Sequence, residues 1–314
     1  MMSQSRNASG PTTHEIRVEP PYRLDLTVTA LRRTTTNVVD VYTADGRYLR
    51  ALDGRTKPVI VSVTQPRRDA LSVSVKGNAA DTTRALATIR RMLGTGRDLS
   101  DFHRHARGVA WLAPLARRLR GIKPPRYPDL FEACANAILF QQVSLRAATA
   151  IMRRLLIAVG AEVEHDGVPL VVFPAAERFL DGKDSVLRAA GVSANKLATL
   201  RRAGEAIASG ALSEAMLEER SSEEAALLLR GIKGIGPWTA AVILLRGLGR
   251  LDVFPGKDSG VAANLTLVAG RPVNVEHLLK RLGSQGGMLY FCLLLARLEA
   301  RGEIGQVSDI ALGL

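Results

Sequence analysis

The sequence is poor in the residues from which disulfide frameworks and metal clusters are built. Its 314 residues include two cysteines, Cys134 and Cys292. Two isolated cysteines cannot supply a four-cysteine zinc or iron–sulfur site. Each lies in an apolar helical pattern, so we expect two buried thiols in a reducing cytoplasm and no metal cofactor.

Long apolar runs are missing as well. No window approaches the ~18 consecutive apolar residues of a membrane span, and residues 1–20 lack the apolar core of a signal peptide. These first residues are polar, and we expect them to form a disordered leader. The sequence therefore predicts a cytoplasmic protein, nucleoid-associated if prokaryotic, without a membrane partner.

Acidic residues are outnumbered by basic ones. The chain has 43 Lys and Arg against 30 Asp and Glu, a formal net charge of +13, while its 46% hydrophobic content is ordinary for a globular protein. This excess predicts attraction to a polyanion, either nucleic acid or an anionic membrane surface, although ribosomal and other basic proteins share it. Residues 102–128 contain no acidic residue, and this basic run is either a solvated face or a contact to phosphate.

The first part of the chain is predicted to be a small antiparallel sheet. Apolar and polar residues alternate over residues 24–30, which is typical of a half-buried strand. Asp45-Gly46 predicts a hairpin turn, and residues 81–94 change to the spacing of an amphipathic helix. The other predicted strands are residues 39–43, 48–52, 59–63 and 71–75. Residues 21–100 should thus form an α+β domain.

From Asp98 the pattern is helical almost to the end, so residues 101–314 are predicted to be an all-α domain. A long helix is expected over residues 129–156, either continuous or broken near Gln141. Residues 160–173 resemble a loop or a short extended segment. Further helices fit residues 182–190, 193–208, 221–230, 237–248, 274–282 and 285–301.

Residues 229–240 carry the most informative pattern. Gly231, Gly234 and Gly236 interrupt two helices, and Pro237 stands at the first position of the second helix, where its missing N–H costs nothing. The pattern predicts a helix-hairpin-helix at about residues 221–248. Its backbone N–H groups and helix dipole suit one DNA phosphate. The alternative is a tight turn between helices without a ligand.

Residues 252–260 read Asp-Val-Phe-Pro-Gly-Lys-Asp-Ser-Gly. Together with Gly-Ile-Gly-Pro-Trp-Thr-Ala at residues 234–240 and Arg246-Gly247, this segment resembles the helix-hairpin-helix DNA glycosylase superfamily. Within it, the pattern is most similar to the 3-methyladenine DNA glycosylase II family. Residues 131–144 also resemble a helix of that family. The N-terminal sheet is similar to the TATA-binding-protein-like domain that precedes its helical core.

The resemblance implies base-excision repair of double-stranded DNA. Such an enzyme flips out an alkylated purine and hydrolyses its N-glycosidic bond, which leaves an abasic site. Asp258 matches the family's catalytic carboxylate, which stabilises positive charge on the sugar and orients water. The alternative for Asp258 is an N-cap of the helix that begins near Ser259.

Other site residues follow from the same resemblance. Gln142 stands where the family inserts a leucine wedge into the duplex, and it could instead be an ordinary glutamine at a helix break. Trp238 is expected to stack on the flipped base, with Phe140 and Tyr290 also at the base, although Trp238 and Tyr290 could be core residues. The predicted phosphate-binding residues are Gly231, Lys233, Gly234, Gly236 and Thr239.

Trp238 occupies the position of the Schiff-base lysine of bifunctional relatives, so simple hydrolysis is expected. Lys257 is a further candidate for phosphate contact. No cofactor is expected beyond a structural monovalent cation at the hairpin, and the protein is expected to be a monomer.

The sequence also departs from the family pattern. Val242 and Leu294 stand at positions that are aromatic in the family's cleft, and aromatic residues make up 4% of the chain. The pocket could therefore be less rich in electrons than that of the family. Two alternatives remain open: a lesion- or structure-binding DNA protein without efficient catalysis, and a glycosylase for another damaged or mismatched base.

Overall fold

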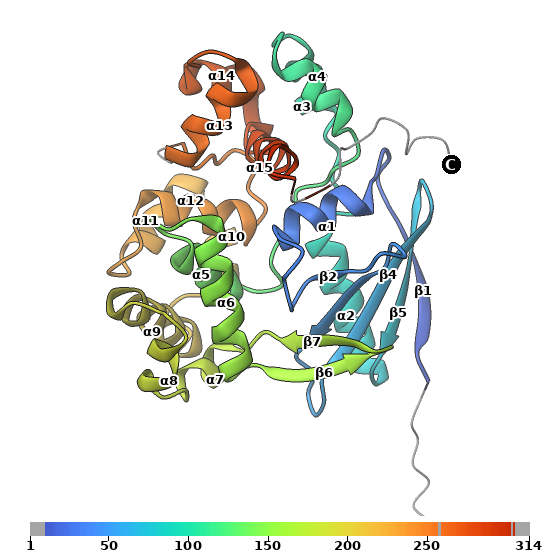
Figure 1. The fold of residues 1–314 in the computed structure, drawn as a ribbon, viewed down its shortest axis with the longest axis vertical. Coiled ribbons are helices and arrows are strands. Elements are labelled where there is room, and N and C mark those ends of the chain that lie inside the picture. The colour runs from blue at the N-terminus through green and yellow to red at the C-terminus, as the bar shows by residue number, and fades with distance from the viewer. Residues whose placement is uncertain (1–9, 257–258, 303, 305–314) are drawn as a thin grey trace, which may run out of the picture.

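The computed structural model describes residues 10–256, 259–302 and 304. An antiparallel sheet stands beside a larger helical body (Figure 1). The strands are β1 (Thr12–Arg17), β2 (Val41–Tyr42), β3 (Tyr48–Leu52), β4 (Val59–Arg67) and β5 (Ala70–Lys76), in the spatial order β1-β5-β4-β3-β2. Helix α2 (Ala79–Met92) packs on β4 and β5. The predicted α+β organisation of this part is confirmed.

The strands predicted from residue 39 onward are confirmed. β2 and β3 flank a turn in which Gly46 has a φ of +83°, a conformation that favours glycine. β4 and β5 place Val61 opposite Val75 and Val63 opposite Val73, and all four are fully buried. Their alternation with polar residues follows the two-residue period of a strand.

Residues 24–30 form a helix, and the predicted strand is wrong. Helix α1 (Leu24–Arg32) buries Leu24, Leu26, Val28 and Ala30, but it also buries Thr27, Thr29 and Leu31. A helix enclosed on most sides has no polar face, so its sequence loses the 3.6-residue period. The Thr27 hydroxyl donates to Arg23 O and accepts from Lys123 N, which satisfies the buried polar group.

Part of the expected disordered leader is a strand. Thr12–Arg17 form β1, which pairs with β5 from Thr12 opposite Val75 to Arg17 opposite Ala70. Ile16 is the one fully buried side chain of this edge strand, so the segment shows no apolar alternation that could have revealed it. Residues 1–9 lie outside the described part of the chain.

The helical body follows. Its helices are α3 (Ser100–Arg107), α4 (Leu112–Arg118), α5 (Leu130–Leu139), α6 (Leu145–Val159), α7 (Ala176–Leu180), α8 (Asp184–Ala189), α9 (Ala194–Ala208), α10 (Glu214–Glu218), α11 (Ser222–Arg230), α12 (Pro237–Arg246), α13 (Ser259–Ala269), α14 (Val275–Leu282) and α15 (Met288–Ala300). Of the two alternatives for residues 129–156, the structure has the broken helix, because α5 and α6 are separate. Cys134 and Cys292 are buried free thiols, and burial raises the pKa of each to about 12. No helix in the described residues is long and apolar enough to cross a membrane.

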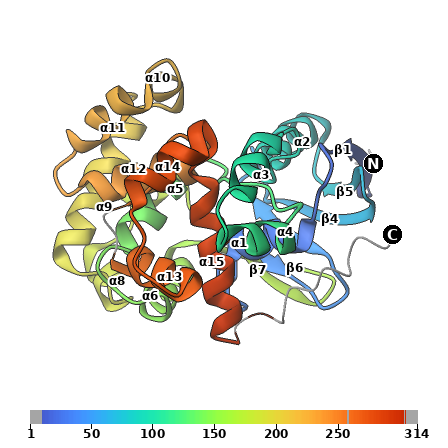
Figure 2. The ribbon, with the colours of Figure 1, turned by 90° about the horizontal axis from the view of Figure 1, so that it is seen from above.

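Three features join the sheet to the helical body. Residues 160–173 contain a hairpin of β6 (Ala161–His165) and β7 (Val168–Val172), and β7 packs against β3. Helices α1 and α15 lie next to each other (Figure 2). Arg50 of β3 donates to Asp40 and to Glu132 of α5, all three buried, and burial raises the pKa of Glu132 while the Arg50 guanidinium opposes that rise.

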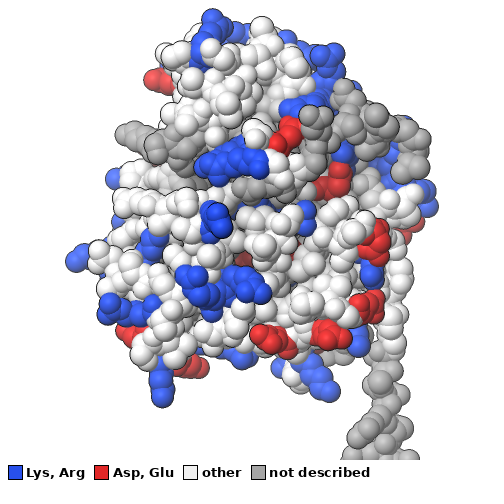
Figure 3. Space-filling view, viewed as in Figure 1, with Lys and Arg blue, Asp and Glu red and all other residues white. Residues whose placement is uncertain are grey.

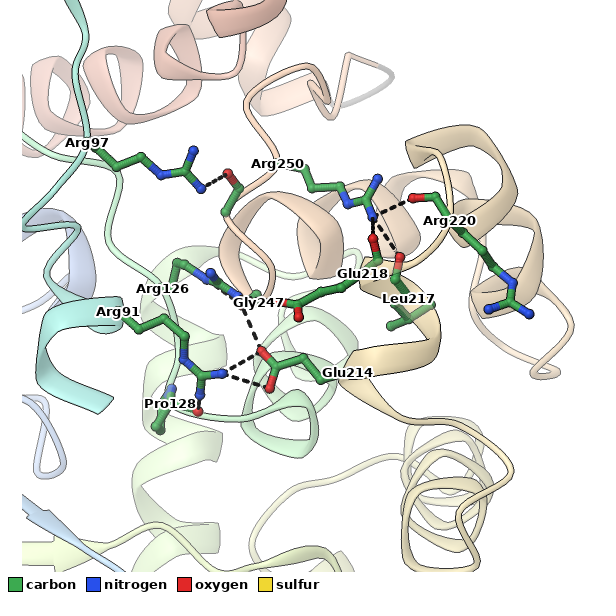
Figure 4. Close-up of polar contacts among 11 residues, drawn as sticks. Arg91, Arg97, Arg126, Pro128, Glu214, Leu217, Glu218, Arg220, Gly247 and Arg250 are labelled. Carbon is green, nitrogen blue, oxygen red and sulfur yellow. Dashed lines mark hydrogen bonds and ion pairs between the residues drawn. The ribbon is translucent and has the colours of Figure 1, made fainter. Parts of the chain in front are cut away.

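A second polar link joins α2 to α10. Arg91 of α2 donates to both carboxylate oxygens of Glu214 in α10 at 2.8 Å, and Arg126 donates to one of them (Figure 4). Arg250, which follows α12, donates to the carbonyl oxygens of Leu217 and Arg220 at 2.6 Å. These contacts fix α10 and the end of α12 against the N-terminal part.

Candidate active site

A cleft of about 840 Å³ opens among four elements of the helical body. Its walls are the turn between α5 and α6, the hairpin between α11 and α12, part of α13 and one side of α15. The predicted site residues that line it are Phe140, Gln142, Gly234, Gly236, Trp238, Thr239 and Tyr290. Folding thus gathers residues from distant segments around one cavity.

The hairpin wall contains two glycines with different roles. Gly234 has a φ of +103°, and a Cβ there would lie 2.0 Å from Oγ1 of Thr199 in α9. Only glycine therefore lets the hairpin pack on that helix. Gly236 has a φ of −88°, and a Cβ there would meet nothing within 4 Å. Nothing in the described part of the molecule requires glycine at position 236.

Helix α12 begins at this wall. Pro237 occupies its first turn, where backbone N–H groups have no acceptor within the helix and the helix dipole favours an anion. Gly231, Lys233 and Gly234 are exposed on the hairpin. Gly231 and Lys233 are not among the residues that line the cleft, so they lie outside it.

The side chain of Thr239 is not placed for a phosphate contact. It is buried, and its hydroxyl accepts a hydrogen bond from Gln141 Nε2 at 2.6 Å. Only the backbone N–H of Thr239, in the first turn of α12, remains suitable for an anion. Gln141 Nε2 also donates to Gly234 O at 3.1 Å, so Gln141 fastens the α5–α6 turn to the hairpin.

The monovalent cation expected at the hairpin stays a prediction. Two hairpin carbonyls already accept one hydrogen bond each: Gly234 O accepts from Gln141, and Lys233 O accepts from the guanidinium of Arg202 at 3.2 Å. A cation bound at these oxygens would share them with two N–H donors, one of them positively charged. Within the described ranges, no group of three or more His, Cys, Asp or Glu residues could hold a metal ion.

Gln142 lies at the tip of the α5–α6 turn. Its φ is +52°, and its side chain is exposed at the cleft. Val143 beside it is 39% exposed, which is unusual for a large apolar side chain in this molecule. Lys196 of α9 supports the turn, since its Nζ donates to the carbonyls of Leu139 and Gln141 at 2.8 Å. An exposed tip on a braced turn is the geometry that a wedge needs.

Three aromatic residues line the cleft. Trp238, Phe140 and Tyr290 are half-buried there. One face of Phe140 is covered by Arg33, whose Cζ lies 4.5 Å from the ring centroid, so that face is not available to a base. Val242 and Leu294 also line the cleft. The aromatic surface is therefore smaller than the family pattern implies.

Asp258 and Lys257 lie outside the described residues. The chain is described again from Ser259, where α13 begins, and Val261 and Asn264 of this helix line the cleft. The sequence therefore connects Asp258 directly to an element of the cleft. Its catalytic role stays a prediction.

Sequence reasoning missed several residues of this site, among them Gln141 and Arg33. Gln141 precedes the predicted wedge, so its position on the turn was a usable signal. Arg33 follows a segment that was interpreted as a strand, and nothing in its local sequence indicates a place beside Phe140. Such a contact depends on how α1 packs against the helical body.

Comparison with known proteins agrees with this arrangement. Residues 135–284 match the HhH-GPD superfamily of base excision DNA repair proteins, and the match includes the α5–α6 turn, the hairpin and α13. Since the sheet of residues 12–76 precedes this match, the predicted architecture of an N-terminal α+β part and a helix-hairpin-helix core is confirmed.

Proteins similar to this chain include curated and solved ones. The DNA-3-methyladenine glycosylase of Bacillus subtilis is 31% identical over 171 residues, 54% of this chain and 56% of that protein. The DNA-3-methyladenine glycosylase 2 of Escherichia coli is 27% identical over 242 residues, 76% of this chain and 82% of that protein. The chain spans about half the length of the first curated relatives it matches. The solved 3-methyladenine DNA-glycosylase from Archaeoglobus fulgidus superposes with a TM-score of 0.75 at 26% identity, over 90% of this chain and 97% of that one.

Proposed function

We propose that this protein is a DNA glycosylase that flips an alkylated purine into the cleft and hydrolyses its N-glycosidic bond, leaving an abasic site. The observation that carries the proposal is the meeting of the hairpin, the Gln142 turn and Trp238 at one cleft next to the start of α13. The relatives named DNA-3-methyladenine glycosylase support the choice of an alkylated base.

The hairpin is proposed to bind one phosphate of the damaged strand. No contact among the described residues requires glycine at position 236. A side chain there would stand in the way of a DNA strand that approaches the first turn of α12. The net charge of +13 attracts the duplex over longer distances. Basic side chains spread over α6 in the middle of the face in Figure 3, and acidic ones lie closer to β6 and β7.

The turn of Gln142 is proposed to fill the gap that the flipped base leaves in the stack. Extrusion of a base costs a few kcal/mol, and a side chain in the gap offsets part of that cost. Gln142 is held for this task because Lys196 and Gln141 fix the residues around it. Val143 adds apolar surface beside it.

The chemical step is proposed to depend on Asp258. As the glycosidic bond breaks, its electron pair leaves with the base and positive charge builds on the sugar. A carboxylate stabilises that charge and accepts the proton of the water that attacks C1′. Trp238 would hold the departing base by stacking.

The same cleft favours hydrolysis over lyase chemistry. Of the described residues that line it, none is a lysine, and Lys196 uses its Nζ on two backbone carbonyls. Among the residues that the structure describes, which do not include Lys257, no amine is therefore placed to attack the sugar. Borohydride should trap no covalent adduct with DNA, whereas a trapped adduct would show a bifunctional enzyme. We expect a monomer in the cytoplasm that acts on double-stranded DNA.

Base release from duplexes that carry 3-methyladenine or 7-methylguanine tests the proposal. We expect release by the wild-type protein and a loss on the order of 10²–10³-fold in Asp258→Asn, with DNA affinity retained. Tight binding without release of any base would instead indicate a lesion-binding protein, which the small aromatic surface at Val242 and Leu294 would explain.

A further inference from the structure

A second cavity, of about 400 Å³, lies where α3 and α4 meet the residues that lead into α1. None of the described residues that line it also lines the cleft. Helix α15 stands between the two cavities, since it packs against α13 on one side and against α4 on the other (Figure 2). The proposed glycosylase function therefore leaves this cavity, which we call the α3–α4 pocket, without a role.

The ionisable side chains of the α3–α4 pocket are mostly basic. A single carboxylate stands among three arginines, a lysine and a histidine in the described lining: Asp98, His103, Arg107, Arg117, Arg120 and Lys123. The basic members all belong to residues 102–128, the run without an acidic residue that suggested either a solvated face or a contact to phosphate. In the structure this run lines part of a cavity, so it is more than a solvated face.

The three arginines have no acid to neutralise them. The guanidiniums of Arg107, Arg117 and Arg120 form no hydrogen bond or salt bridge with a described residue. Arg118, beside them in α4, shows the contrast, because it is bound to Glu299 of α15. Unpaired guanidiniums suit phosphate in particular, since their planar N–H groups match two phosphate oxygens at once.

Lys123 is the buried cation of the lining. It is 2% exposed, and burial lowers the pKa of its ammonium, although the charges of Glu19 and Asp98 act against this. Its Nζ donates to Arg97 O at 2.7 Å, which uses one of its three N–H groups. The other two have no acceptor among the described residues. Buried donors of this kind favour a ligand that supplies oxygen atoms.

The ring of His103 shows that the basic groups lie close together. Burial lowers its pKa to about 4, helped by the positive charges of Arg120, Lys123 and Arg107. Asp98 acts in the opposite direction and more weakly. The three cations come from the end of α3 and from the segment after α4, yet all of them act on one imidazole. The pocket therefore concentrates positive charge from two segments.

The rest of the lining is largely apolar. Leu99, Ala116 and Ile122 are buried there, and Pro21 and Ala113 are half-buried. The volume of the pocket is in the range of small-molecule sites, whereas an extended peptide binds along an open groove or a sheet edge. Apolar surface beside unpaired guanidiniums fits a small ligand that joins a flat group to phosphate.

We infer that the α3–α4 pocket binds a nucleotide, with the phosphates on the basic side chains and the base against the apolar surface. Duplex DNA is a poorer fit, because its phosphates lie on a convex backbone that can reach the exposed arginines but not the buried Lys123. The inference goes beyond the proposed glycosylase function and does not rest on it, since the two cavities share no described residue.

Binding of ADP, pyrophosphate and adenosine tests the inference. Isothermal titration calorimetry at about 0.15 M ionic strength limits non-specific attraction. We expect ADP to bind at least about 10-fold more tightly than pyrophosphate, because the base adds apolar contact, and adenosine not to bind measurably. Arg117→Gln and Arg120→Gln should each weaken ADP binding about 10-fold. Arg104→Gln is the matched control, since Arg104 of α3 is exposed, pairs with Asp101 and does not line the pocket.

A second measurement locates the ligand. In NMR titrations, saturating ADP should raise the pKa of His103 from about 4 toward its ordinary value of 6.5, because phosphate stabilises the charged ring. His105 lies in the same helix but does not line the pocket, so its resonance should not respond to ADP. ADP that binds without any change at His103 would lie elsewhere, and the inference would be overturned.

The other outcomes are equally decisive. Equal affinities for ADP and pyrophosphate, or equal ADP affinities of the wild type and Arg120→Gln, overturn the nucleotide site. If undamaged duplex displaces ADP and both pocket variants bind duplex more weakly, the pocket contacts DNA and the inference fails. Base release is assayed separately without nucleotide. A wild type that releases no base overturns the glycosylase function and leaves the ADP results intact.

Discussion

The two walls of the cleft are built in different ways. The hairpin wall is one continuous segment, in which Gly234 permits a positive φ and Pro237 stands at the start of α12. A second wall gathers Arg33 from the end of α1, Phe140 from the end of α5 and Tyr290 from α15. Phosphates are the same in every nucleotide and bases are not. Backbone groups therefore suit binding of DNA that does not depend on the base, and an assembled set of side chains suits selection of a base.

The largest effect is expected where the hairpin wall meets α9. Gly234→Val should lower the free energy of unfolding by about 2–5 kcal/mol, because Val would overlap Thr199 and would be held at a positive φ. Urea denaturation measures the change. Unaltered stability would mean that the hairpin does not pack on α9 as described.

Removal of the link between the walls comes next. Gln141→Ala takes away the hydrogen bonds to Gly234 O and to the buried Thr239 hydroxyl. We expect a loss of about 1–3 kcal/mol in unfolding free energy and slower base release. If Gln141→Asn and Gln141→Ala behave alike and both match the wild type, the two walls are not coupled through this side chain.

Gly236→Val is the counterpart of Gly234→Val. Gly236→Val should change the unfolding free energy by less than about 1 kcal/mol, since the Cβ enters open space at an ordinary φ. Affinity for damaged and undamaged duplex should fall by about 10-fold alike, as expected for a lost phosphate contact. Normal binding by this variant would contradict the phosphate site.

The smallest effect concerns a single exposed charge. Lys233→Gln should weaken binding a few-fold for all sequences and reduce the slope of log affinity against log salt by about 1, since each phosphate contributes about −0.9. Titrations by fluorescence anisotropy at several salt concentrations measure the slope. Lys233 makes no phosphate contact if the slope stays the same.

The contrast between the walls also explains what could be predicted from the sequence. The hairpin could be predicted from local rules, because glycine at position 234 indicates a turn and proline at position 237 indicates the start of a helix. Arg33 has no such local signal. Its position depends on α1 packing beside α15, a contact between segments far apart in the chain.

The dependence on contacts between distant segments also limited the prediction of the fold. Strands with one buried face, such as β4 and β5, kept their alternation and were predicted. Helix α1 is enclosed on most sides, so its apolar residues showed a strand-like period by chance. β1 has one buried residue and gave no pattern at all. In each case, tertiary burial rather than local preference decided the element.

The most direct test of the division between phosphate binding by the hairpin and base selection by the side chains compares Trp238→Leu with Gly236→Val. For each variant, single-turnover base release at saturating protein is measured together with affinity for undamaged duplex. We predict that Trp238→Leu slows base release at least about 10-fold and leaves the affinity for undamaged duplex unchanged, because one stacking contact contributes about 1–3 kcal/mol. Gly236→Val should lower the affinity for undamaged duplex and leave the rate of base release at saturating protein unchanged. A parallel loss of both properties in both variants would contradict the account.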